Sequence, residues 1–157
     1  MNKKNIKKGF LSAREYQNIL GSVPVVCVDL IVKCGDEVLL VKRNHKPAKG
    51  KLWIPGGRIL KGETFKKAIL RKLQEDAGIS KRLVTCITPL PAGETFFKTS
   101  EFGVPTHTIN ITFLVTVSKK KNQKSGLDGD IFWFKNIPSS VSPYVRKYVL
   151  FATSFNK

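Results

Sequence analysis

The sequence has 157 residues, 41% of them hydrophobic, and it carries 28 lysines and arginines against 11 acidic residues. This length favours a single domain with a hydrophobic core. No stretch holds the roughly 18 apolar residues that a membrane-spanning helix needs, so no membrane partner is expected. The net charge of +17 favours anionic partners such as phosphates, nucleotides or nucleic acid, although lysine runs of this kind can equally be a solvated surface.

The cysteines indicate the cellular compartment of the protein, and the first residues indicate where its domain begins. Cys27, Cys34 and Cys86 are odd in number and lack CxxC spacing, so reduced thiols in a cytoplasmic protein are expected. Residues 1–9 are rich in lysine and are expected to form a flexible basic arm. The single domain is therefore expected to span residues 10–157.

The chain is expected to open with a short helix and a hairpin. Ser12 and Glu15 have the spacing of a capping box, in which each side chain bonds the backbone of the other, so a helix should start there. Residues 25–32 are apolar and β-branched, as in a buried strand. A turn at 34–36 then returns the chain into a second strand over 37–41.

A longer amphipathic helix is predicted from Thr64 to Gly78. Apolar side chains recur at the spacing of one helix face, at Phe65, Ala68, Ile69 and Leu73. The glycine is typical of the residue that ends a helix. A Gly-Gly pair at 56–57, directly after Trp53-Ile54-Pro55, is expected to form a sharp loop ahead of this helix.

Acidic residues gather on the polar face of that helix. Glu75 and Asp76 lie there, on the side expected to face Glu63 and the carbonyl groups of the loop at 56–57. Clustered carboxylate and carbonyl oxygens suit a hard cation such as Mg²⁺. The plain alternative is a solvated helix face whose acids bind nothing.

The rest of the chain predicts further strands and a last helix. Strands are expected at 83–87, 94–98, 108–117 and 131–134, a polar loop at 119–129, and a closing helix at 143–151. Strands that alternate with helices in this order predict an α/β fold with a mixed sheet flanked by helices.

Residues 57–79 resemble the Nudix box, G-x5-E-x7-R-E-U-x-E-E-x-G-U, where U is a bulky aliphatic residue. The matching positions are Gly57, Glu63, Arg71, Leu73, Glu75, Gly78 and Ile79. Asp76 replaces a glutamate, and Lys72 stands where the second glutamate is expected. The resemblance implies the Nudix α/β/α sandwich and a hydrolase that uses Mg²⁺, with Mn²⁺ as an alternative ion.

Within that family, residues 10–78 resemble the GDP-mannose mannosyl hydrolase branch. The resemblance is carried by F-L-x-x-x-x-Y, S-V-P-V-V-C-V-D-L-I-V, K-R-N-H-K-P-A-K-G and W-I-P-G-G-R. That branch also lacks the second glutamate of the box, so Lys72 is compatible with membership. Its members cleave a GDP-hexose by attack of water at the sugar carbon and release GDP.

The resemblance implies a role for several side chains. The Gly56 carbonyl and Asp76 would hold Mg²⁺, with Glu75 as a nearby carboxylate. Arg43 and Arg58 would face the diphosphate, and fixed guanidinium groups there would stabilise the negative charge that grows on the leaving GDP.

Asp29 would lie beside the sugar. An isolated carboxylate inside an apolar strand is costly unless it is paired, so a structural pair with a nearby arginine is the alternative reading of Asp29.

One departure concerns the general base. The branch uses a Gln-His pair before the strand that ends in Trp133, and the matching positions here are Leu127 and Asp128. An exposed aspartate has a pKa near 3.9, well below the working pH of a good base. Three outcomes stay open: Asp128 or Asp130 acts as the base, the reaction differs, or catalysis is weak or lost.

Three functions are therefore in competition. The first is an Mg²⁺-dependent hydrolase of a nucleotide sugar, GDP-mannose or a related GDP-hexose, which releases GDP and sugar. The second is a Nudix pyrophosphatase that cuts between the phosphates of a nucleoside diphosphate compound. The third is a catalytically weak Nudix domain that binds nucleotide or RNA, which only the basic charge supports. A homodimer is an open alternative to a monomer.

Overall fold

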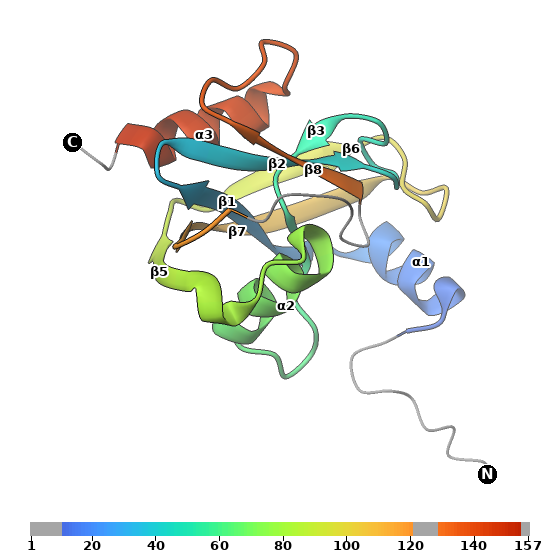
Figure 1. The fold of residues 1–157 in the computed structure, drawn as a ribbon. Coiled ribbons are helices and arrows are strands. Elements are labelled where there is room, and N and C mark those ends of the chain that lie inside the picture. Colours follow the sequence, from blue (N-terminus) through green and yellow to red (C-terminus); the bar gives the residue numbers. More distant parts are fainter. Residues whose placement is uncertain (1–10, 121–128, 155–157) are drawn as a thin grey trace.

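The computed structural model describes residues 11–120 and 129–154. The predicted arm at 1–9 and the candidate base Asp128 lie outside these ranges. Within them the elements follow in the order α1 (Ala13–Ser22), β1 (Val25–Cys34), β2 (Glu37–Arg43), β3 (Leu52–Trp53), β4 (Gly56–Arg58), α2 (Phe65–Ala77), η1 (Lys81–Leu83), β5 (Val84–Pro89), β6 (Gly93–Phe97), β7 (Thr106–Val117), β8 (Gly129–Phe134) and α3 (Pro143–Ser154). Figure 1 shows their arrangement.

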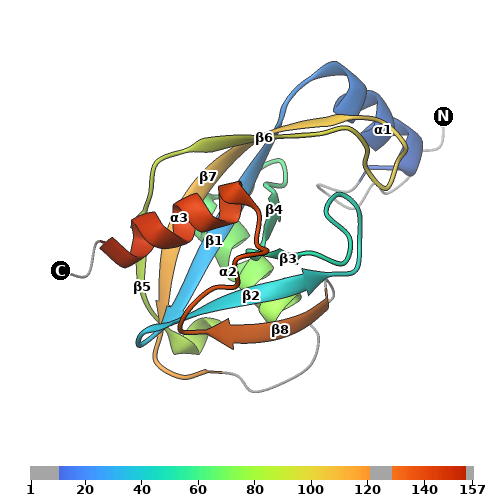
Figure 2. The ribbon, with the colours of Figure 1, turned by 90° about the horizontal axis from the view of Figure 1, so that it is seen from above.

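A mixed sheet of eight strands forms the middle of the described structure. Its main order is β3-β2-β1-β7-β5, while β4 pairs with β1, β6 with β7 and β8 with β2. The central pair, β1 and β7, is parallel from Val25 opposite Thr108 to Lys33 opposite Thr116, and the other pairs are antiparallel. Helices α2 and α3 cover opposite faces of the sheet (Figures 1 and 2), so the predicted α/β sandwich is confirmed.

The core consists of two apolar layers, one on each face of the sheet. Leu30 and Val32 of β1 pack in the layer under α2, whereas Ile31 packs in the layer under α3. All three side chains are completely buried. A strand buried on both faces needs apolar residues at successive positions, which explains the continuous apolar run at 30–32.

Local signals in the sequence set the helix ends. Glu15 accepts from the Ser12 backbone N–H at 2.8 Å and donates its own N–H to the Ser12 hydroxyl at 3.3 Å, which confirms the predicted capping box. Thr64 caps the start of α2, and Gly78 ends it in the left-handed conformation with φ of 61°. None of the helices in the described ranges is long and apolar enough to cross a membrane.

One prediction about the backbone was wrong. Residues 56–57 were expected to form a loop, but they belong to strand β4, where Gly56 lies opposite Asp29 and Gly57 opposite Val28 of β1. The pairing brings the backbones so close that a Cβ atom on Gly56 would lie 2.4 Å from the Val28 carbonyl oxygen. Glycine is therefore required by the tight contact between strands, and a sequence pattern alone does not reveal such a contact.

The packing of α3 against β6 gives a prediction about stability. A Cβ atom on Gly93 would lie 2.2 Å from the hydroxyl oxygen of Tyr148, a buried residue of α3. Gly93→Ala should therefore lower the free energy of unfolding by about 1–3 kcal/mol, the usual cost of overpacking. Gly21→Ala is the matched control, because nothing lies within 4 Å of a Cβ there and helix α1 should gain roughly 0.5–1 kcal/mol. Urea denaturation of both variants tests this, and equal stabilities would contradict it.

Candidate functional site

Arg71 on α2 ties the helix to the segment that precedes it. Its Nε donates to Glu63 Oε1 and its Nη2 to Glu63 Oε2, both at 2.8 Å. The same guanidinium donates to the Arg58 carbonyl oxygen at 3.0 Å and to Glu75 at 3.1 Å. Hydrogen bonds from Arg71 hold the pKa of Glu63 below its usual range. This two-pronged bond is the strong, oriented kind that arginine forms with carboxylates, so it fixes the end of β4 against the helix.

The three residues predicted to hold a metal lie together. The Gly56 N–H donates to Asp76 Oδ2 at 2.9 Å, and Glu75 precedes Asp76 on the same helix. They border a shallow hollow of about 330 Å³, which is lined by Arg43, His45, Gly56, Gly57, Lys72, Glu75 and Asp76. The side chain of Asp76 is only 1% exposed, so its carboxylate is buried in the wall of this hollow.

The donor atoms are of the right kind for Mg²⁺, but a cationic side chain already contacts them. Carboxylate and carbonyl oxygens are the ligands that Mg²⁺ takes in proteins. Lys72 Nζ lies 2.7 Å from Asp76 Oδ1 and 3.2 Å from Glu75 Oε2. Among the described residues, no group of three or more His, Cys, Asp or Glu side chains is placed to hold a metal ion. The chemistry of the set fits the ion when Lys72 is displaced, and the Mg²⁺ site stays a prediction.

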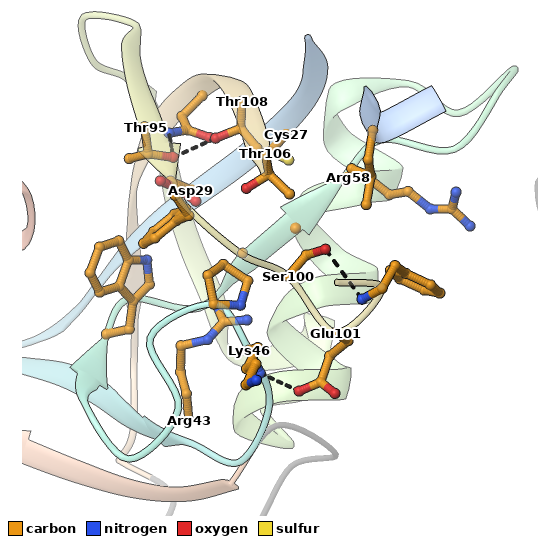
Figure 3. A pocket seen from close by; sticks show the side chains of 18 of the residues that line it. Cys27, Asp29, Arg43, Lys46, Arg58, Thr95, Ser100, Glu101, Thr106 and Thr108 are labelled. Atoms are coloured by element: carbon orange, nitrogen blue, oxygen red, sulfur yellow. Dashed lines mark hydrogen bonds between the residues drawn. The ribbon is translucent and has the colours of Figure 1, made fainter. Parts of the chain in front are cut away.

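A second, deeper cavity of about 210 Å³ adjoins the hollow and shares Arg43, Gly56 and Gly57 with it. The charged residues that line this cavity are Asp29, Arg43, Lys46, Arg58 and Glu101, and Glu101 accepts from the Lys46 backbone N–H. Polar side chains and aromatic rings line it as well, among them Trp53, Thr95, Phe97, Thr106, Thr108 and Asn110. In Figure 3 Arg43 and Lys46 lie toward one end of the cavity, and Asp29, Thr95 and Thr108 toward the other.

The polar end of the cavity is partly connected by hydrogen bonds. Thr95 and Thr108 share one between their hydroxyl groups, and the Asn110 amide donates to Thr95 Oγ1 at 3.3 Å. The Thr106 hydroxyl is buried and has no hydrogen-bond partner among the described residues. Because a buried polar group without a partner is costly, a hydroxyl of this kind at a cavity wall indicates a ligand or solvent partner.

Asp29 lies in the wall of the deeper cavity and is 6% exposed. Its Oδ2 accepts from the Tyr144 hydroxyl at 2.7 Å, which joins β1 to α3. Burial raises the pKa of Asp29 to about 6, while the Tyr144 hydrogen bond and the charge of Arg43 act in the opposite direction. The sequence offered a nearby arginine as the structural partner of Asp29, whereas the structure shows a hydrogen bond from a tyrosine hydroxyl and a charge effect from Arg43.

The two predicted arginines occupy different positions. Arg43 ends β2 and borders both cavities. Arg58 lies at the edge of the deeper cavity, with its guanidinium 4.3 Å from the ring centre of Tyr16 on α1. Figure 3 shows that guanidinium directed away from Asp29. Stacking on an aromatic ring stabilises a cation and sets its direction, so Tyr16 orients Arg58.

Polar residues of β6 and β7 belong to the candidate site in addition to those predicted from the sequence. Thr106, Thr108 and Asn110 occupy every second position of β7, and they line the cavity together. This period of two was available in the sequence, since polar residues at alternate positions of an otherwise buried strand indicate a polar interior face. The alternative base Asp130 is exposed on β8, where it lies opposite Lys42.

The raised pKa of Asp29 gives a prediction about stability and pH. Because the folded pKa is about 6 and the ordinary value is 3.8, the folded state loses stability as pH rises from about 4 to about 6. Asp29→Asn should remove this loss and raise the free energy of unfolding at pH 7.5 by up to about 3 kcal/mol, with little effect at pH 4. Denaturant titrations at both pH values measure it. In the exposed control Asp130→Asn, the free energy of unfolding should change between the two pH values as it does in the wild type. The same change in Asp29→Asn would contradict the prediction.

Comparison with known proteins agrees with this geometry. The NUDIX domain family model matches residues 23–136. The chain is 31% identical over 137 residues to the low-salt glycan biosynthesis protein Agl8 of Haloferax volcanii, which covers 86% of each chain. It is 28% identical over 138 residues to the ADP-ribose pyrophosphatase of Methanocaldococcus jannaschii, covering 87% of this chain and 75% of the relative.

Solved structures show the same fold at low sequence identity. The NUDIX domain of Shewanella oneidensis NrtR in complex with ADP ribose has a TM-score of 0.65 at 19% identity and covers 94% of this chain and 100% of its own. The MutT NUDIX hydrolase of Burkholderia pseudomallei has a TM-score of 0.64 at 19% identity, with coverage of 82% and 98%. Together with the box on α2, the family match shows that this chain belongs to the Nudix family, as a hydrolase of nucleoside diphosphate derivatives.

Proposed function

We propose that the protein hydrolyses a nucleotide sugar, GDP-mannose or a related GDP-hexose, to GDP and the free sugar. The observation that carries this proposal is the deeper cavity, in which basic side chains at one end adjoin buried hydroxyl, amide and carboxylate groups at the other. A ligand with an anionic part and a hydroxylated part matches this division. The relative named for glycan biosynthesis supports the same substrate class.

The size of the cavity limits which part of the substrate enters it. Typical ligand pockets are roughly 300–1,000 Å³, and this cavity is about 210 Å³. It therefore suits one ring of a nucleotide sugar, with the remainder on the basic surface outside. In the proposal, Asp29 and the hydroxyl and amide groups of β6 and β7 bind the hydroxyl groups of the hexose.

The basic residues would act on the leaving group. When GDP departs, negative charge grows on its terminal phosphate, and preorganised cations aimed at that charge lower the barrier. Arg43 borders both cavities, and Arg58 is oriented by Tyr16 at the edge of the deeper one. Their guanidinium groups can bond phosphate oxygens in pairs, which a lysine ammonium cannot do.

The cofactor of the proposed reaction is Mg²⁺, with Mn²⁺ as a substitute. The Gly56 carbonyl, Glu75 and Asp76 would hold the ion once Lys72 is displaced. A bound dication would polarise a phosphoryl oxygen and offset the charge of the leaving group. Asp128 would be the general base, with Asp130 as the alternative. A cytoplasmic location belongs to the same proposal, and the three cysteines, all unpaired by disulfides, agree with it.

A pyrophosphatase is the second candidate. It is favoured by the relative that is named an ADP-ribose pyrophosphatase, which aligns over most of this chain. The same basic residues would serve this reaction, since it also develops negative charge on phosphate oxygens.

The products distinguish the two reactions. We expect incubation with GDP-mannose and Mg²⁺ in ¹⁸O-labelled water to give intact GDP and a hexose that carries the label. Sugar phosphate, GMP and label in a phosphate group would instead establish the pyrophosphatase, and ADP-ribose belongs in the same substrate panel. Binding of GDP without turnover of any compound would indicate a domain that only binds nucleotide.

Arg58 provides the mutational test. Because the charge that it meets is larger in the transition state than in the bound substrate, Arg58→Ala should lower kcat by about 10²–10³-fold with a smaller effect on KM. Arg82→Ala is the control for loss of one positive charge, since Arg82 is exposed and does not line either cavity. A raised KM at unchanged kcat would show that Arg58 only binds substrate.

A further inference from the structure

Lys72 stands where the Nudix box has its second glutamate, and the structure shows what it does there. Its Nζ lies 2.7 Å from Asp76 Oδ1 and 3.2 Å from Glu75 Oε2. The Lys72 side chain is 15% exposed, so its ammonium sits in the hollow rather than on the outer surface. A single positive charge thus contacts both acids of the α2 pair.

The ammonium satisfies a requirement set by burial. An ionised carboxylate as buried as Asp76 is costly unless a positive charge or hydrogen bonds compensate it. Asp76 Oδ1 meets Lys72, and Asp76 Oδ2 accepts from the Gly56 N–H at 2.9 Å. Glu75 Oε2 is shared between Lys72 and Arg71. The contacts that a cation would supply to these oxygens are therefore made by the protein itself.

The stem of Lys72 is also held in place. A Cβ atom on Gly57 would lie 3.2 Å from Lys72 Cε and 3.5 Å from Nζ, so the side chain passes directly over the glycine of β4. Gly57 has a φ of 155°, a conformation that other residues rarely adopt. Its missing side chain leaves room for the lysine, and the strand backbone keeps the ammonium close to the acids.

A divalent ion and the ammonium would use the same oxygen atoms. A dication placed between Asp76 and Glu75 would meet the positive charges of Lys72 and Arg71 at short range, where like charges repel strongly. The divalent ion and the Lys72 ammonium therefore compete for the position between Asp76 and Glu75, and only one of them can occupy it at a time.

We propose that Lys72 is a built-in counter-cation that occupies the cation position of the Nudix box in the free protein, so that a divalent ion binds only when this ammonium is displaced. Lys72 is then the residue that sets the divalent-ion affinity of the site. The free protein binds Mg²⁺ or Mn²⁺ weakly, and the acids keep their compensation without any metal.

The position of the hollow indicates what displaces the ammonium. The hollow shares Arg43, Gly56 and Gly57 with the deeper cavity, so a diphosphate on these residues lies within reach of the Lys72 side chain. Phosphate oxygens then offer the ammonium a second partner and release the acids for the ion. This part of the inference rests on the proposed function, and it makes metal and diphosphate binding mutually reinforcing.

Mn²⁺ binding to the free protein tests the first part. Electron paramagnetic resonance titration should show weak binding to the wild type and at least about tenfold tighter binding to Lys72→Gln, because one competing charge is removed. Lys66→Gln on the same helix is the matched control, since Lys66 is exposed and faces a different surface. Tight Mn²⁺ binding to the wild type, or equal binding to wild type and Lys72→Gln, would overturn the proposal.

The melting temperature provides a second measurement, which can be made even on a variant that is less stable than the wild type. Lys72→Glu should melt at a lower temperature than the wild type without metal and recover with Mn²⁺, because the ion then replaces the lost ammonium beside Asp76. The wild type and Lys66→Gln should show little change on the same addition. If saturating Mn²⁺ does not raise the melting temperature of Lys72→Glu, the ion cannot take the place of the ammonium, and the proposal fails.

The second part is tested by adding GDP. GDP should raise the Mn²⁺ affinity of the wild type by about fivefold or more and that of Lys72→Gln by less, after correction for Mn²⁺ bound by GDP alone. Equal enhancement in both proteins would overturn the displacement by diphosphate. If the protein does not bind GDP, the proposed function fails, whereas the result of the metal titration without nucleotide still decides the role of Lys72.

Discussion

The bond between Arg71 and Glu63 is the constraint on which the rest of the site depends. One guanidinium holds the acid before α2, the carbonyl oxygen at the end of β4, and an acid one turn further along the helix. The segment between β4 and α2 is thereby held at both of its ends, by the pairing of β4 with β1 and by the bonds from Arg71. Because Gly56 and Gly57 of β4 line both the hollow and the deeper cavity, a clamp on the end of this strand also holds the wall that the two cavities share.

The wall of the deeper cavity contains polar side chains at buried positions, where apolar residues would stabilise the fold more. A buried carboxylate on the central strand has a raised pKa, and a buried threonine hydroxyl lacks a partner within the described ranges. Both features cost stability, and local departures of this kind are typical of functional sites. The apolar layers on the two faces of the sheet offset these costs, since the side chains of Leu30, Ile31 and Val32 are fully buried.

What the sequence predicts well is local. The caps at Ser12 and Gly78 depend on neighbours within one helical turn, and both were found as predicted. Of the apolar stripe of α2, Ala68, Ile69 and Leu73 are buried as predicted, whereas Phe65 is exposed. Asp76 was expected on the polar face of the helix, but the contact of α2 with β4 buries it. The alternation along residues 108–117 correctly gave a strand. The expected loop at 56–57 was wrong, because its strand pairing depends on a segment about thirty residues earlier.

The partner of Asp29 could not be predicted for the same reason, since it lies on a different element of the fold. Lys72 was visible as a departure from the box, but its contacts with both acids depend on side-chain positions that the pattern of the box does not specify. The hydrogen bond from Tyr144 spans 115 positions and joins the first strand to the last helix. Asp29 therefore gains this hydrogen bond only when α3 packs on the sheet. Contacts of such long range slow folding, so the wall of the cavity that contains Asp29 is expected to assemble later than the helix caps and the hairpin of β1 and β2.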